Sequence, residues 1–85
     1  MVDIELIIKS ICYTELMYQR INKKLKTDLS HSDIEKYILK ILNESHKENF
    51  IKTGKNYYIS NFDENVRVTV NSNTFRVITV DKVSR

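Results

Sequence analysis

The residues of this sequence whose types and spacing could do chemistry are basic and aromatic. Arg67 and Thr69 alternate within VRVTV, Arg76 lies within TFRVITV, and Tyr58 precedes both segments. If these segments are neighbouring strands, alternation places the polar side chains on one face of the sheet. Arginine holds phosphates, and an aromatic ring stacks on bases. The pattern therefore predicts a sheet face that binds nucleic acid or an acidic protein, with Lys55 at its border.

A second basic cluster comprises Arg20, Lys23, Lys24 and Lys26. Cations complement the dipole at the C-terminal end of a helix, so a solvated helix end explains this cluster equally well. The outer face of an antiparallel sheet is also ordinarily polar, and the same alternative applies to the first group. Binding is favoured if the two clusters lie on one side of the folded domain.

Other kinds of site find little support in the sequence. Cys12, His31 and His46 are the only cysteine and histidines, and their spacing matches no zinc signature. Cys12 lies in an apolar run, which predicts a buried thiol, and neither histidine has an evident partner. The Gly54-Lys55 pair is not part of a phosphate loop, because that motif needs an earlier glycine and Gly54 is the only one in the sequence. Gly54 is interpreted as a turn residue with positive φ. We therefore expect no catalytic residue, no metal site and no cofactor.

Size and charge restrict the class of protein. The chain has 85 residues, which predicts a single domain over 1–85, and its net charge of +3 is too small to identify a nucleic-acid binder. A single cysteine excludes an intramolecular disulfide. Asp3 and Glu5 lie where a signal peptide carries basic residues, and no run of about 18 apolar residues is present. We expect a cytoplasmic protein without a membrane segment.

Helical spacing marks two segments that must position these side chains. The first is predicted over residues 3–25, and a break near Ser10 to Thr14, with Thr14 capping a second helix, is left open. The second is predicted over 31–46, with Ser32 or Ser30 as its cap. The apolar positions that support them are Ile4, Ile7, Ile8, Ile11, Tyr18, Ile21 and Leu25, and then Ile34, Tyr37, Ile38, Ile41 and Leu42.

The period changes to two in the C-terminal half, which predicts strands over 56–60, 66–70 and 74–80. The fold class is then α+β, with two N-terminal helices packed on one face of a three-stranded antiparallel β-meander (ααβββ). One register of the last hairpin gives a coherent apolar face. It pairs Val70 with Phe75, Val68 with Val77, Val66 with Thr79, Arg67 with Ile78 and Thr69 with Arg76. The core of the meander is then Val66, Val68, Val70, Phe75 and Val77.

Four segments carry a resemblance to a known family: ICYTEL at 11–16, RINKKL at 20–25, TGKNYYI at 53–59 and NSNTFRVITVD at 71–81. The chain resembles a group of short bacterial proteins catalogued as domain of unknown function 3781. The likeness extends over nearly the full chain. It implies a bacterial or phage origin, and it brings no activity, cofactor or site residue with it.

The leading functional hypothesis is a small non-enzymatic binding protein that docks to nucleic acid or to a nucleic-acid-handling complex. One alternative is a phage or mobile-element inhibitor of a host protein, of the anti-CRISPR type. Another is a metal-independent ribonuclease-type toxin, which needs a base such as His31 or His46. Homodimerisation through an edge strand or through the first helix is also expected, because Leu6, Tyr13, Leu16 and Met17 fall off its main apolar stripe.

Overall fold

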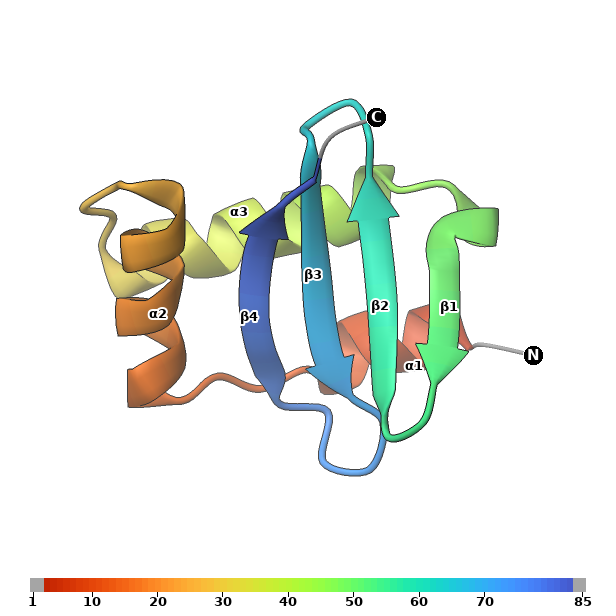
Figure 1. Ribbon diagram of the computed structural model, residues 1–85. Helices are drawn as coiled ribbons and strands as arrows, with labels where there is room; N and C mark the ends of the chain where they lie inside the picture. Colours follow the sequence, from red (N-terminus) through yellow and green to blue (C-terminus); the bar gives the residue numbers. More distant parts are fainter. Residues whose placement is uncertain (1–2, 84–85) are drawn as a thin grey trace.

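The computed structural model describes residues 3–83 of the chain. These residues form three helices and a four-stranded antiparallel sheet (Figure 1). The helices are α1 (Ile4–Ser10), α2 (Glu15–Leu25) and α3 (His31–Glu44), and a 3₁₀ turn, η1, spans Lys47–Asn49. The strands are β1 (Phe50–Thr53), β2 (Asn56–Asn61), β3 (Val66–Asn71) and β4 (Val77–Lys82), in the spatial order β1-β2-β3-β4. The predicted α+β class is confirmed, but the structure has one more helix and one more strand than predicted.

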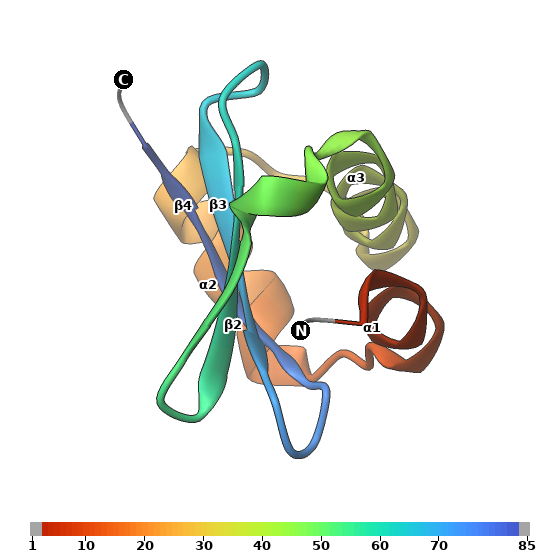
Figure 2. The same cartoon turned by 90° about the vertical axis from the view of Figure 1, so that its right-hand side faces the viewer.

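The helices do not all cover the same face of the sheet. Figure 2 shows α1 and α3 on one side of the strands, and in Figure 1 α2 stands beside β4, at the edge of the sheet. Among residues 3–83, no helix lies over the other face (Figure 2). The prediction that all the helical sequence packs on one face is therefore wrong for α2, which closes the β4 edge and leaves β1 as the open one.

The predicted helix over 3–25 is interrupted, as the open alternative allowed. α1 ends at Ser10, and Thr14 caps α2 by accepting a hydrogen bond from the Met17 amide at 3.4 Å. Between them, the Cys12 amide donates to the Phe75 carbonyl and the Val77 amide donates to the Cys12 carbonyl, both at 2.9 Å. The chain leaves the helix because Cys12 forms a parallel bridge with the start of the last strand.

The second predicted helix is confirmed as α3, with Ser30 as its cap and not Ser32. The Ser30 hydroxyl accepts from the Asp33 amide at 3.2 Å, and the helix ends at Glu44. Four side chains of its stripe are fully buried, Ile34, Ile38, Ile41 and Leu42. None of the helices in residues 3–83 has the length and apolar character needed to span a bilayer.

β1 was not predicted as a strand. It pairs antiparallel with β2, from Phe50 opposite Ile59 to Thr53 opposite Asn56, and only Phe50 of its four residues is buried. A strand with one buried residue gives almost no alternating signal. Gly54 makes the turn into β2 with φ +62°, as the sequence predicted.

The predicted register of the last hairpin is wrong by three positions at its open end. Val66 lies opposite Lys82, Val68 opposite Val80 and Val70 opposite Val77, with a bulge that leaves Ile78 without a partner across the ladder. The bulge turns both Val77 and Val80 into the core, where each is at most 1 % exposed.

The loop between β3 and β4 explains the shift. The side chain of Asn71 accepts hydrogen bonds from the Asn73 and Thr74 amides, and its backbone pairs with Phe75 and Arg76. Phe75 takes a left-handed conformation with φ 59° and packs its ring 6.3 Å from that of Tyr57. Residues 72–76 are therefore loop and not strand. Of the five residues predicted as the core of the meander, the four valines are buried and Phe75 is half-buried.

Candidate functional site

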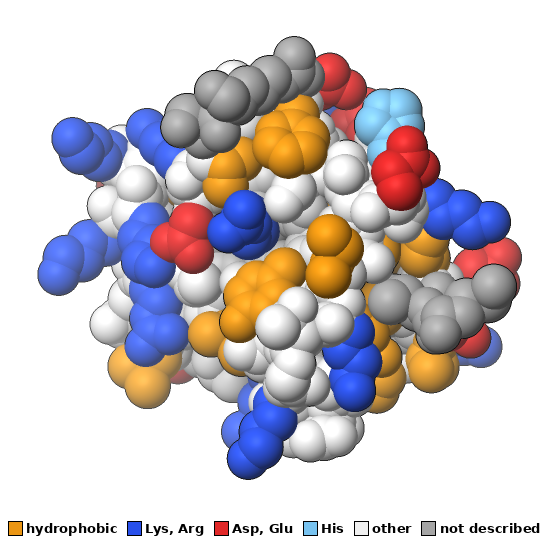
Figure 3. Space-filling model, turned by 45° about the vertical axis from the view of Figure 1, so that its right-hand side comes forward, with side chains coloured by type: hydrophobic (Ala, Val, Ile, Leu, Met, Phe, Trp, Pro, Cys, Tyr) orange, Lys and Arg blue, Asp and Glu red, His pale blue; other side chains and the backbone are white. Residues whose placement is uncertain are grey.

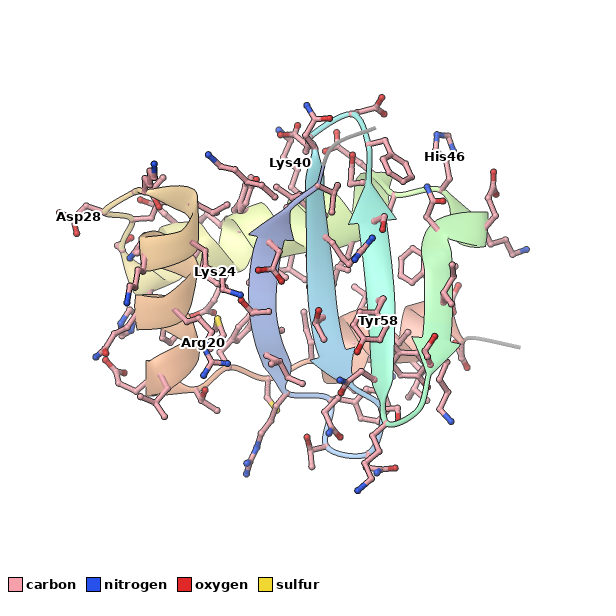
Figure 4. The ribbon with its side chains drawn as sticks, viewed as in Figure 1. Arg20, Lys24, Asp28, Lys40, His46 and Tyr58 are labelled. Carbon is pink, nitrogen blue, oxygen red and sulfur yellow. The ribbon has the colours of Figure 1, made fainter. Side chains whose placement is uncertain are left out.

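The packing of α2 against β4 brings the two predicted basic clusters together. Lys24 of α2 reaches across to Asp81 of β4, with 2.5 Å between Nζ and Oδ1, and Asp81 lies opposite Arg67 of β3. Arg67 donates from Nε to the Ser60 hydroxyl at 3.3 Å. In Figure 4 the side chains of Arg20 and Lys24 extend from α2 toward the sheet, on the face where Tyr58 lies.

Arg20 and Arg76, which come from different clusters, line one surface hollow of about 290 Å³. Leu16 and Ile78 form part of its apolar lining. Arg76 reaches this position because its backbone is bridged to Cys12 and lies outside β4. The predicted pairs Arg67 with Ile78 and Arg76 with Thr69 are therefore wrong, since Arg67 lies opposite Asp81 and Thr69 opposite Thr79.

We call Arg20, Lys23, Lys24, Arg67 and Arg76 the α2–β4 basic surface. All five are exposed. Figure 3 shows lysine and arginine side chains gathered on the α2 side of the molecule, with hydrophobic side chains over the middle of the strands. Asp81 is half-buried between Lys24 and Arg67 and offsets part of their positive charge. One carboxylate against five cationic side chains leaves the surface with an excess of positive charge.

The other predicted site residues lie around this surface with different exposures. Tyr58 is half-buried, and its hydroxyl accepts a hydrogen bond from the Asn56 side chain at 3.3 Å. Thr69 is only 6 % exposed, which leaves its hydroxyl little access to a ligand. Lys55 is exposed in the β1–β2 turn, where its carbonyl accepts from the amide and hydroxyl of Ser72. Lys26 is the exposed left-handed cap of α2, with φ 57°.

A cluster of aromatic and acidic residues between α2 and α3 was missed by the sequence analysis. The rings of Tyr18 and His31 stack with centroids 3.8 Å apart, and His31 Nε2 lies 3.5 Å from a carboxylate oxygen of Glu15. The Tyr18 hydroxyl donates to Glu35 at 2.7 Å. Burial, and then this hydrogen bond, raise the pKa of Tyr18 to about 12. Tyr18 belongs to the predicted apolar stripe, but nothing in the local pattern indicates its pairing with residues beyond the loop.

This cluster fixes α2 to α3 and so holds the basic surface in place. His31 is engaged by Tyr18 and Glu15, and Figure 4 shows His46 on the opposite side of the molecule from Arg20 and Lys24. The chemistry that the surface offers is therefore charge and hydrogen-bond donation from guanidinium and ammonium groups, next to exposed apolar area.

Cys12 is exposed, contrary to the prediction of a buried thiol, because the backbone bridge to Arg76 takes it out of the helix. Its Sγ lies 3.6 Å from the Thr74 carbonyl oxygen. Within residues 3–83 no three His, Cys, Asp or Glu side chains are grouped so that they could hold a metal ion.

The family model described as "Protein of unknown function (DUF3781)" matches residues 5–81. No curated protein and no solved structure matches the chain.

Proposed function

Because this chain belongs to the DUF3781 family, whose description names no activity, we propose from its own geometry that it is a non-enzymatic protein that binds single-stranded nucleic acid. The observation that carries the proposal is the hollow shared by Arg20 and Arg76. Two guanidiniums from separate elements line the same depression, and Lys23 and Lys24 extend the charge along α2. Such an arrangement fits a chain of phosphates better than an isolated anion.

The apolar part of the surface supports a single strand over a duplex. Leu16 is 71 % exposed beside Arg20, and Ile51 is 54 % exposed on the open face, opposite Tyr58. Unpaired bases can stack on the Tyr58 ring and on the guanidinium planes beside these apolar side chains, whereas a duplex keeps its bases stacked inside. The open face of the sheet lies next to the basic surface, so a single strand of nucleic acid can contact both.

The salt dependence of binding tests this proposal. Affinity for a labelled single-stranded oligonucleotide, measured by fluorescence anisotropy, should fall log-linearly with salt, with a slope of about −0.7 for each phosphate that is neutralised. The double variant Arg20→Ala with Arg76→Ala removes two such contacts and should reduce the magnitude of the total slope by about 1.4. A matched control is Lys36→Ala with Lys47→Ala, which removes the same charge from exposed positions on α3 and η1.

Two results would contradict the proposal. One is the absence of binding at about 50 mM salt. The other is an equal loss in the Lys36 and Lys47 control, which would indicate attraction to net charge alone. Toxicity on overexpression that Arg76→Ala relieves would instead indicate the ribonuclease-type alternative.

A second candidate, an inhibitor that docks on an acidic host protein, is favoured by the exposure of Leu16. Leu16 lines the same hollow as Arg20 and Arg76, and protein interfaces combine an apolar centre with arginine. Capture from a bacterial lysate after nuclease treatment distinguishes the candidates. A protein partner that survives nuclease and is lost with Leu16→Glu supports the inhibitor, whereas the nucleic-acid proposal expects retention of partners to depend on intact RNA or DNA.

A further inference from the structure

A second depression lies at the C-terminal end of α2, beyond Lys24, and none of its lining residues belongs to the α2–β4 basic surface. It has a volume of about 470 Å³ and lies between the C-terminal end of α2, α3 and the β2–β3 turn. Leu25, Leu29 and Val66 contribute apolar walls, and Tyr37, Glu64 and Lys82 contribute polar groups. Pockets of roughly 300 to 1,000 Å³ with apolar walls and few polar groups are typical of small-molecule sites.

The wall formed by the α2–α3 loop is held by one side chain, that of Asn22. Its Nδ2 donates to the Leu29 carbonyl at 3.0 Å, and its Oδ1 accepts from the Leu29 amide at 2.9 Å and from the Thr27 hydroxyl at 2.8 Å. The loop is therefore fixed around Leu29 by both of its backbone groups. A ligand that binds there does not have to order this segment.

The opposite wall is held in the same way by Asn61, which is 3 % exposed. Its Oδ1 accepts hydrogen bonds from the Asp63 and Glu64 amides at 3.1 and 3.0 Å, and its Nδ2 donates to the Ile41 carbonyl at 3.3 Å. The turn between β2 and β3 is thus tied to α3. Both walls are preorganised by buried or half-buried asparagine side chains.

The charged residues that line this pocket are Glu64 and the exposed Lys82, and they differ in their partners. Glu64 is paired with Lys40 at 3.3 Å, so its charge is offset. Lys82 lies opposite Val66 in the ladder and so points to the helix side of the sheet, unlike Asp81. None of the ion pairs among residues 3–83 includes Lys82. The pocket therefore offers one ammonium group next to apolar walls, with the hydroxyl of Tyr37 as a further donor.

We propose that this pocket binds a small amphipathic carboxylic acid. The apolar body of the ligand packs between Leu25, Leu29 and Val66, and its carboxylate contacts the ammonium of Lys82. The pocket adjoins the α2–β4 basic surface but shares no lining residue with it, so its test does not depend on nucleic-acid binding.

The experiment uses the whole chain, isotope-labelled for amide NMR, and octanoate as the probe. We expect saturable shifts confined to residues around the pocket, and affinity that rises about fourfold for each methylene from hexanoate to octanoate. Octanol, which lacks the charge, should bind about fivefold more weakly than octanoate, and Lys82→Gln should remove this difference. Lys52→Gln, an exposed substitution on β1, is the matched control and should preserve the difference.

Three outcomes would overturn the proposal. Shifts that appear at Arg20 and Arg76 instead of the pocket would indicate general anion binding. Equal affinity for octanoate and octanol would remove the role of Lys82. No saturable shift with any of the acids would show that the pocket does not take this class of ligand. The length series on the unmodified protein keeps the test valid if Lys82→Gln does not fold.

Discussion

Replacing the half-buried Asn22 by alanine should destabilise the protein more than a typical substitution in the last turns of a helix. The side chain makes three hydrogen bonds, two to the backbone of half-buried Leu29 and one to the exposed Thr27 hydroxyl. The Thr27 hydroxyl can bond water instead, but the Leu29 amide and carbonyl lose partners worth about 1 kcal/mol each. Alanine returns at most about 0.7 kcal/mol of helix propensity. The net loss is about 1.5 kcal/mol.

Thermal and urea denaturation followed by circular dichroism measure this loss. For a domain of this size, 1.5 kcal/mol corresponds to a fall in Tm of about 6 to 12 °C. Asn43→Ala is the control, because the Asn43 side chain donates only to the Leu39 carbonyl on the surface of α3. We expect that variant to stay within about 0.5 kcal/mol of the unmodified protein. If Asn22→Ala loses no more than Asn43→Ala, the α2–α3 loop is not held as described, and the preorganised wall of the pocket fails with it.

Three further predictions concern single residues. Thr79→Val should raise the free energy of unfolding, measured by urea titration, by about 1 kcal/mol. Thr79 is 8 % exposed, and its buried hydroxyl has no hydrogen-bond partner among residues 3–83. A loss of stability in this variant would refute the prediction. Thr14→Ala should cost about 1 kcal/mol by removing the cap of α2, and Thr14→Ser, which keeps a hydroxyl, should cost less. Tyr18 has a pKa raised from 10.0 to about 12, so its contribution to stability is fully present below pH 10 and is lost as the pH rises to about 12. Alkaline denaturation of Tyr18→Phe should lack that component, and identical pH profiles for the two proteins would contradict the assignment.

Patterns confined to one element could be predicted from the sequence. The stripe of α3 from Ile34 to Leu42 gave a helix within two residues of its observed ends, and the alternation in VRVTV gave β3 and its buried valines. Both segments bury a regular face against the core, so period and burial agree. β1 buries only Phe50, and no period can appear in one residue.

The sequence predicts two separate sets of cationic residues in the candidate site. It could not predict that the two sets lie next to each other in the fold. Arg20 and Arg76 belong to segments that are far apart in the chain, and they line one hollow only because α2 packs along β4. Charge and spacing identify a basic residue within its own element. They carry no information on which edge of the sheet that element covers.

The two main errors, the uninterrupted helix over 3–25 and the register of the last hairpin, have a common physical cause. The Cys12 amide and carbonyl bond to Phe75 and Val77, and these two hydrogen bonds end the helical run and hold Arg76 outside β4. A continuous helix of that length would extend about 34 Å, close to the 35 Å of the longest dimension of the fold, and could not turn to cover the β4 edge. The parallel bridge between Cys12 and Arg76 therefore separates α2 from α1, shifts the hairpin and carries Arg76 to Arg20. A single long-range pairing, which no local pattern encodes, thus creates the basic surface on which the proposed function depends.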